Sequence, residues 1–149
     1  MTATKKILVP TDFSKFSDNA LKQAVEMAKQ NKAKVYLLHV IEVVQACAVY
    51  YCLDQQTIDT LDKKSIKSSE DMMQKQIKKV GSPKDIEIIS YVKKGTPYEE
   101  ILKEQEGKKI NLIVMAAHGQ TGLRSHLLGS VADKVARHAK CPVLLVKGK

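Results

Sequence analysis

Tryptophan is absent from the 149-residue sequence, and aromatic residues make up only 5% of it. Proteins that bind single-stranded nucleic acid stack its bases on aromatic side chains, so this scarcity argues against that class of protein. The net charge of +9 favours anionic partners in general. The lysines, however, are spread along the chain in twos and form no basic tail. We therefore interpret the charge as a solvated, lysine-rich surface and expect no nucleic-acid partner.

Cysteine and long apolar runs are scarce as well. The three cysteines, Cys47, Cys52 and Cys141, are odd in number and lack paired spacing, which argues against a disulfide framework and a zinc site. No apolar run approaches the length of a membrane span, so we expect no membrane partner. Residues 1–6 carry no apolar secretory region before the first apolar run. These absences predict a cytoplasmic location.

The composition is typical of a soluble globular protein. Hydrophobic residues make up 44% and charged residues 28% of the chain, and 149 residues suffice for one sizeable core. No internal repeat, linker or shift in composition divides the sequence. We therefore expect a single domain over residues 1–149.

Short apolar runs alternate with helical periodicity along the chain. We expect strands at 7–9, 35–40, 86–92, 112–115 and 143–146, and helices at 17–30, 55–80, 98–106 and 131–139. Strands separated by helices predict an α/β fold, an open five-stranded parallel sheet flanked by helices, with right-handed crossovers. The first strand is apolar throughout and belongs at the centre of the sheet, whereas the strand at 86–92 alternates and belongs near an edge.

Polar residues set the expected boundaries of these elements. Ser17 and Asp18 are typical of a helix start. Residues 93–97 predict a turn, with Thr96 as the cap of the next helix and Pro97 as its first residue. The long helix has a polar stretch at 63–69, so it is exposed or broken there. Its expected core residues are Ile58, Leu61, Met72, Met73, Ile77 and Val80. Residues 41–56 have no clear period, and we interpret them as a partly buried loop.

Residues 116–130 join an expected buried strand to an expected helix through a loop with glycines at 119, 122 and 129. Glycine lets a ligand approach the backbone closely. The first N–H groups of a helix lack internal partners, and the helix dipole makes that end positive, so a phosphate fits there. Ser130 adds a hydroxyl for a phosphate oxygen or a metal ion. The stretch is neither a P-loop nor Gly-x-Gly-x-x-Gly, so an ordinary turn before a helix explains the pattern equally well.

Asp12 follows the first strand, at the edge of an open α/β sheet where ligands bind. It is a candidate for binding a ligand there, directly or through a metal ion. Alternatively, Asp12 or Ser14 accepts hydrogen bonds from backbone N–H groups before the helix, and the residues alone favour that interpretation. His39 lies within an apolar strand, and we interpret it as a hydrogen-bonded core residue.

The glycine loop resembles the signature of the universal stress protein family, Gly-x-x-Gly, nine residues, then Gly-Ser/Thr. Gly119, Gly129 and Ser130 match it, and Ala116 replaces the first glycine. Segments 6–14, 127–131 and 140–146 are also similar to the family, and the resemblance covers essentially the whole chain. It implies the Rossmann-like fold of the adenine nucleotide alpha hydrolases and a nucleotide-responsive factor in stress or signalling. The alanine would be costly only if the backbone there required a positive φ.

The resemblance is to the ATP-binding members, and it implies a site between the carboxyl ends of the first and fourth strands. The backbone of Val40 would lie beside the adenine, and His118 and Arg124 would add charge or hydrogen bonds. Mg²⁺ or Mn²⁺ would offset the triphosphate charge, with Asp12 or Ser130 as a ligand. The implied nucleotide-binding residues are Pro10, Thr11, Asp12, Val40, Met115, Ala116, His118, Gly119, Arg124, Gly129, Ser130 and Val131.

Other functions stay open at this point. A weak ATPase or kinase-like enzyme would need groups for phosphoryl transfer; Asp12 and His118 are present, but they form no recognisable catalytic constellation, so we assign no catalytic residue. A dimeric stress protein that does not bind ATP is the third candidate. The family resemblance implies a homodimer through Val143–Val146, a short apolar strand that needs covering if it lies at an edge. No protein partner is identified by the sequence.

Overall fold

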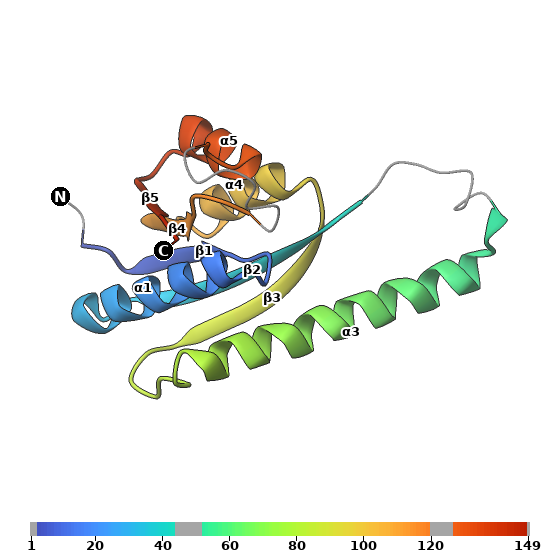
Figure 1. The fold of residues 1–149 in the computed structure, drawn as a ribbon, viewed down its shortest axis with the longest axis horizontal. Coiled ribbons are helices and arrows are strands. Elements are labelled where there is room, and N and C mark those ends of the chain that lie inside the picture. The colour runs from blue at the N-terminus through green and yellow to red at the C-terminus, as the bar shows by residue number, and fades with distance from the viewer. Residues whose placement is uncertain (1–2, 44–51, 120–126, 149) are drawn as a thin grey trace.

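The computed structural model describes residues 3–43, 52–119 and 127–148 (Figure 1). Its strands are β1 (Lys6–Pro10), β2 (Lys34–Glu42), β3 (Ile88–Gly95), β4 (Leu112–Ala116) and β5 (Val143–Val146). Its helices are α1 (Lys15–Asn31), α3 (Gln55–Lys79), α4 (Pro97–Gly107) and α5 (Ser130–His138). All strand pairs are parallel, in the order β3-β2-β1-β4-β5. The predicted α/β class, the central first strand and the edge position of β3 are therefore confirmed.

Two helical layers cover the sheet, with α1 and α3 on one face and α4 and α5 on the other (Figure 1). Successive side chains of a strand point to opposite faces, so Ile7 and Val9 pack with α1 while Leu8 packs with α4 and α5. The chain leaves β1 towards β2 and later returns to the other side of β1 as β4. The carboxyl ends of β1 and β4 therefore border the point where the winding reverses, which is the usual ligand position in such sheets.

The start of α1 lies two residues before the predicted Ser17. Ser14 is the N-cap, and its hydroxyl accepts a hydrogen bond from the Ser17 backbone N–H at 3.2 Å. Asp12 in turn accepts from the Ser14 N–H at 3.0 Å. Ser17 lies inside the first turn and donates its hydroxyl to the Ser14 carbonyl at 2.9 Å. The predicted boundary was wrong because Ser14, Ser17 and Asp18 are all typical N-cap residues. Ser14 is the one whose side chain accepts from a backbone N–H of the first turn.

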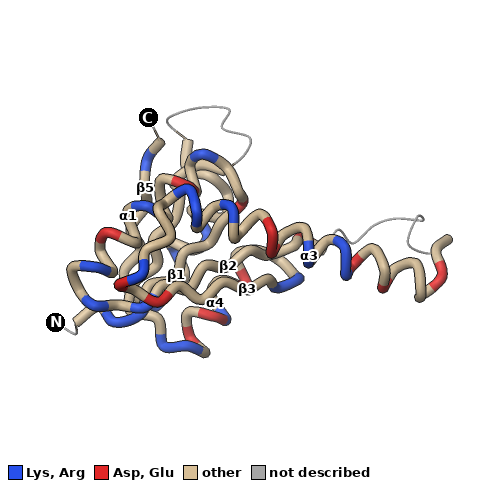
Figure 2. Tube along the Cα trace, turned by 90° about the horizontal axis from the view of Figure 1, so that it is seen from below, with Lys and Arg blue, Asp and Glu red and all other residues tan. Residues whose placement is uncertain are grey.

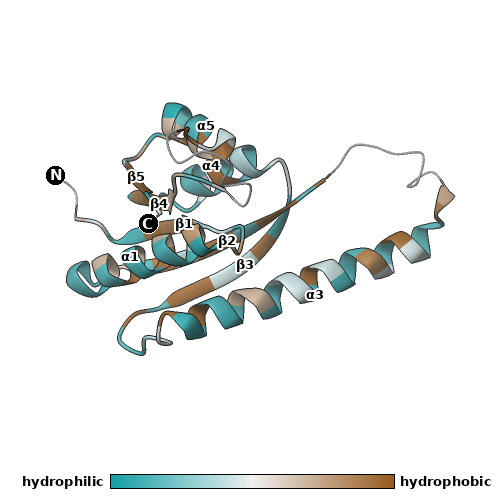
Figure 3. Cartoon of the chain, in the orientation of Figure 1, coloured by the Kyte–Doolittle hydropathy of each residue, from teal (hydrophilic) through white to brown (hydrophobic). Residues whose placement is uncertain are grey.

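Helix α3 is one unbroken helix, so the possible break at 63–69 does not occur. An ion pair between Lys67 and Asp71, four residues apart and with 2.9 Å between Nζ and Oδ1, stabilises the helix in this polar stretch. The expected core residues are only partly confirmed, since Met73 is buried but Leu61 and Met72 are 51% and 42% exposed. The reason is visible in Figures 1 and 2, where α3 continues past the sheet and its first half projects from the body. Figure 3 shows apolar residues on that projecting part too.

Strands β2 and β3 extend further than predicted. The residues expected to form a turn, Lys93, Lys94 and Gly95, pair with Val40 to Glu42 of β2, so the predicted turn was wrong and Ile41 and Glu42 are not loop residues. Side chains hold this extension, because Lys93 pairs with Glu104 of α4 and Lys94 pairs with Asp62 of α3 at 2.6 Å.

The remaining boundaries agree with the sequence to within a residue or two, apart from β3, which ends three residues later than predicted. Thr96 is the N-cap of α4 and Pro97 its first residue, although the Thr96 side chain makes no capping hydrogen bond. Of the cysteines, Cys52 and Cys141 are free thiols, and Cys47 lies outside the described residues. No helix within residues 3–43, 52–119 and 127–148 combines the length and apolarity needed to cross a bilayer.

Candidate functional site

A cavity of about 590 Å³ lies at the carboxyl edge of the sheet. The ends of β1, β2 and β4 contribute to it, together with α3 on one side and the starts of α4 and α5 on the other. The predicted residues that line it are Pro10, Thr11, Asp12, Val40, Met115, Ala116, His118, Gly119, Gly129, Ser130 and Val131. Arg124 is the remaining predicted residue, and it lies outside the described part of the chain. Segments more than one hundred residues apart in sequence thus meet around one space.

The turn after β1 forms one wall and is held in an uncommon backbone conformation. Phe13 has a φ of +66°, a value that bulky residues rarely adopt. Its N–H donates to the Thr11 hydroxyl at 3.1 Å, and its ring lies 4.3 Å from that of His39. His39 Nδ1 lies 2.8 Å from the Thr11 carbonyl oxygen. Since a carbonyl only accepts, Nδ1 carries the proton, and the expected hydrogen bond of His39 is confirmed. The expected core position was wrong, because the side chain is half-buried and lines the cavity.

The opposite wall is formed where residues 117–119 of the glycine loop lie close to Gly129 at the start of α5. Gly129 is the N-cap of α5, and its N–H donates to the Ala117 carbonyl at 2.8 Å. A Cβ at Gly129 would lie 3.3 Å from that carbonyl oxygen and 3.5 Å from the Gly119 nitrogen. Gly129 has a φ of −60°, so the site needs glycine here for space rather than for its backbone angle. A glycine N-cap also has no side chain that could accept from the first amides of α5.

The two walls nearly meet at Gly119. A Cβ built there would lie 3.3 Å from Asp12 Oδ2, so the carboxylate of the β1 turn faces the glycine loop. Asp12 also accepts from the Ser14 N–H, as the alternative interpretation predicted. The carboxylate and the positive end of α5 therefore face the same cavity, which suits an anion accompanied by a cation.

Ala116 occupies an ordinary strand position. It is the last residue of β4 and pairs with Val146 of β5. It is not among the residues with positive φ. The backbone at this position is therefore compatible with alanine, and the reservation attached to the missing first glycine does not apply to this conformation.

The predicted residues His118, Asp12 and Ser130 line the cavity, and their surroundings bear on whether it can hold a metal ion. The His118 ring lies edge-on to that of Phe16, with 6.2 Å between the centroids. Among the residues that the structure describes, no group of three or more His, Cys, Asp or Glu side chains is placed to hold a metal ion. Asp12 and Ser130 both line the cavity, so a metal ion there would require oxygens from a bound phosphate to complete its coordination.

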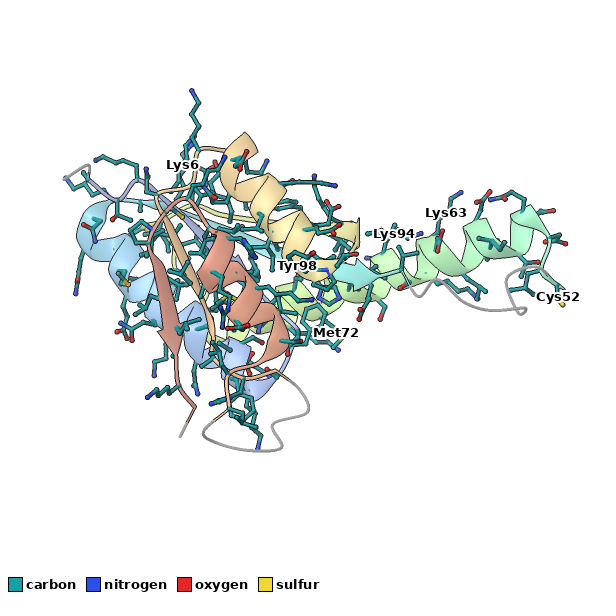
Figure 4. All side chains as sticks on the ribbon, turned by 90° about the horizontal axis from the view of Figure 1, so that it is seen from above. Lys6, Cys52, Lys63, Met72, Lys94 and Tyr98 are labelled. Carbon is teal, nitrogen blue, oxygen red and sulfur yellow. The ribbon has the colours of Figure 1, made fainter. Side chains whose placement is uncertain are left out.

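Helix α3 contributes a third wall that the sequence did not predict. Ser65, Ser69 and Met72 line the cavity, at spacings of four and three residues that bring them to one face of the helix. Figure 4 shows Met72 beside the body of the protein, whereas Lys63 lies on the projecting part of α3 and Cys52 lies beyond the start of that helix. Two serines and a partly exposed methionine resemble a solvated helix face, so only the spatial arrangement reveals them as cavity residues.

Comparison with known proteins gives consistent matches along the chain. The model of the universal stress protein family matches residues 3–147. Universal stress protein MJ0531 of Methanocaldococcus jannaschii is 38% identical over 143 residues, which cover 96% of this chain and 82% of that protein. The structure of universal stress protein UspA from Lactobacillus plantarum has a TM-score of 0.82 at 24% identity and covers 99% of this chain and 100% of that one.

Two further structures of this fold hold nucleotides. A universal stress protein in complex with cAMP has a TM-score of 0.68 at 22% identity, covering 97% of this chain and 98% of that one. A protein of the universal stress protein family from Arabidopsis thaliana with AMP bound has a TM-score of 0.62 at 20% identity, covering 97% and 92%. At these identities the likeness establishes a shared fold.

Proposed function

The chain belongs to the universal stress protein family, and from that premise we propose that it binds ATP in the carboxyl-edge cavity and acts as a nucleotide-responsive stress or signalling factor in the cytoplasm. One observation carries the proposal: every predicted nucleotide-binding residue that the structure describes lines the same cavity. Its volume of about 590 Å³ lies in the range typical of small-molecule sites.

The two ends of the cavity suit the two ends of the nucleotide. The apolar side chains of Val40, Met115 and Ile101 line it near the strand ends and α4, where a base would be shielded from water. Gly119, Gly129 and Ser130 offer backbone N–H groups and a hydroxyl to the phosphates at the positive end of α5. His118 and Arg124 belong to the same loop in the sequence and would add hydrogen bonds or positive charge.

A divalent cation, Mg²⁺ or Mn²⁺, would accompany the triphosphate and offset its charge. Asp12 or Ser130 would supply a protein oxygen, and the phosphates the others. The cAMP and AMP of the two related structures share an adenosine and one phosphate with ATP. That common part supports an adenine nucleotide here.

The proposal predicts micromolar binding of Mg-ATP that a single substitution in the glycine loop abolishes. Gly129→Asp should remove measurable binding, because the new carboxylate would stand where the phosphates are held and repel them. Aspartate is a good N-cap, so α5 should still form. Isothermal titration calorimetry measures the effect. Gly107→Asp is the matched control, since a Cβ there meets no atom within 4 Å and the residue does not line the cavity.

The control variant should bind as the parent does. If the parent protein itself gives no heat with Mg-ATP and no binding by equilibrium dialysis, the proposal is wrong and the function lies elsewhere on the surface.

The proposal includes a homodimer through Val143–Val146. β5 is an edge strand of the sheet, and all four of its apolar residues are only half-buried. Pairing with a second copy would provide hydrogen-bond partners for the backbone N–H and C=O groups at this edge and cover these side chains. Light scattering on the 16.6 kDa chain should give twice the monomer mass, and a monomer at micromolar concentration would contradict this part of the proposal.

A further inference from the structure

A buried polar side chain, Gln76, connects α3 to the turn that lines the cavity. The residue is 3% exposed. Its Oε1 accepts from the Thr11 hydroxyl at 2.9 Å, and its Nε2 donates to Asp18 Oδ1 at 2.8 Å and to Ser17 Oγ at 3.3 Å. One amide therefore bonds to β1's end and to the first turn of α1 at once.

The carboxylate of Asp18 fixes the orientation of the Gln76 amide, because a carboxylate accepts and Nε2 must therefore face it. Ser17 uses its own hydroxyl hydrogen on the Ser14 carbonyl, so it receives the amide hydrogen of Gln76. The Thr11 oxygen receives the Phe13 N–H, and its own hydrogen has two acceptors, Gln76 Oε1 at 2.9 Å and Ser17 Oγ at 3.0 Å. Buried polar groups that lose such partners cost free energy, so an apolar side chain of equal size cannot replace the amide without loss.

Although α3 is 25 residues long, few of its side chains are buried against the rest of the protein. Only Ser69, Met73 and Gln76 are buried among its 25 residues, and Met73 is the single apolar one. Near the end of the helix, Asp18 also pairs with Lys79 at 3.3 Å, and this pair adds little because the lysine is exposed. The half-buried Ile77 packs against the core as well, and Asp62 pairs with Lys94 of β3. Beside these contacts, the amide of Gln76 is the one that ties α3 to Thr11 at the cavity.

Both partners in this connection also face the cavity. Thr11 lines it from the turn after β1, and Ser65, Ser69 and Met72 line it from α3. We infer that Gln76 is a positioning residue that holds α3 as a wall of the nucleotide site, so that nucleotide binding and the docking of α3 stabilise each other. The inference rests on the proposed nucleotide function. Such coupling is reciprocal, because whatever α3 gains from the nucleotide, the nucleotide gains from α3.

The coupling gives nucleotide occupancy an effect beyond the cavity. The face of α3 that docks continues into the projecting half of the same helix, where Leu61 is 51% exposed. Residues 55–79 form one continuous helix whose turns are joined by backbone hydrogen bonds, so fixing residues 65–76 also fixes the direction of the projecting half.

Hydrogen exchange on the parent protein tests the coupling without any mutation. Saturating Mg-ATP should slow exchange of the α3 amides from 65 to 79 as well as those at 129–131. Protection at 129–131 without protection on α3 would overturn the inference while leaving the proposed function intact. Absence of protection in both segments, with no heat of binding, would overturn the proposed function and the inference with it.

A matched pair of substitutions on α3 then tests the residue. Gln76→Met keeps the side-chain volume but removes the amide, and it should weaken Mg-ATP binding about tenfold, within the usual range of coupling between sites. ATP-dependent protection of α3 should be lost in this variant. Gln74→Met makes the same change two residues away, where the glutamine is exposed and donates to Ser90 at 3.2 Å, and this variant should bind Mg-ATP as the parent does. Equal affinity and equal protection in both variants would overturn the role of Gln76. If Gln76→Met does not fold, the exchange experiment on the parent decides.

Discussion

Two helices cover the same face of the sheet, but they are held there by different interactions. α1 buries five apolar residues in 17, whereas α3 buries one in 25. The apolar stripe of α1 packs on the central strands, as Ile7 and Val9 show. The helix α3 buries only Met73 fully, and otherwise depends on the half-buried Ile77, on the polar bonds of Gln76 and on the ion pair between Asp62 and Lys94. Apolar burial holds a helix regardless of ligand, while a helix held by polar groups at a cavity is suited to respond to what the cavity contains.

The sharpest test of this difference is a pair of leucines. Leu21→Ala in α1 should lower the free energy of unfolding by about 2–5 kcal/mol, since the side chain is fully buried and leaves a cavity. Leu61→Ala in α3 should change it by less than about 0.5 kcal/mol, because that side chain is half exposed. Urea denaturation measures both. Equal losses would mean that something covers the projecting half of α3 in solution.

Two adjacent methionines sharpen the comparison within α3. Met73→Ala should cost about 2–3 kcal/mol and speed hydrogen exchange along α3 more than along α1, because it removes the one buried apolar contact. Met72→Ala is the control, since Met72 is 42% exposed and its loss should leave the stability nearly unchanged. If Met73→Ala accelerates exchange equally in both helices, α3 is not the more weakly attached of the two.

The N-caps of the two helices should differ in the same way. Ser14→Ala removes the hydrogen bond to the Ser17 amide and should lower global stability by about 1 kcal/mol, because α1 is part of the core. Asp54→Ala removes the equivalent bond to Thr57 in α3. It should fray the projecting turn without shifting the global unfolding midpoint. A shared loss of global stability in both variants would show that the projecting turn belongs to the cooperative core.

The smallest effect is a local response to acid at the start of α3. Hydrogen bonds from Thr57 hold the pKa of Asp54 below its ordinary value. A depressed carboxyl pKa stabilises the helix start above the pKa of the unfolded chain, and this contribution disappears as pH falls through the folded value. The Thr57 amide resonance should therefore titrate below the usual aspartate range, while the Ser17 amide, capped by a serine, should not follow that titration. A Thr57 titration in the ordinary aspartate range would contradict the cap.

Local patterns predicted most of the fold. Continuous apolar runs identified the buried strands, since parallel strands covered on both faces have no polar side, and Val143–Val146 was placed at its observed bounds. The ends of β2 and β3 were placed too early because Lys93 and Lys94 look like turn residues. Their salt-bridge partners, Glu104 and Asp62, lie on other helices and cannot be found by reading neighbours.

Only part of the candidate site could be predicted, again because some contacts join residues far apart in the sequence. Residues at strand ends and in the glycine loop carry a local signal, and the structure gathers those it describes around one cavity. Their role towards a nucleotide stays a prediction, as does that of Arg124. The α3 wall was missed because Ser65 and Ser69 look like surface residues. Gln76 was missed because a buried glutamine is recognised only by its partners, which lie 58 to 65 residues away.

The most direct test of the central claim, that the carboxyl-edge cavity is an adenine-nucleotide site, is a titration of the assigned amide spectrum with Mg-ATP. The account predicts that the shifts gather at the amides of residues 11–12, 40–42, 115–119 and 129–131, and on α3 between 65 and 76. The amides of Lys32 and Lys34, at the opposite end of the sheet, should stay unchanged. Shifts that gather at those lysines instead, or no shifts at all, would contradict the claim.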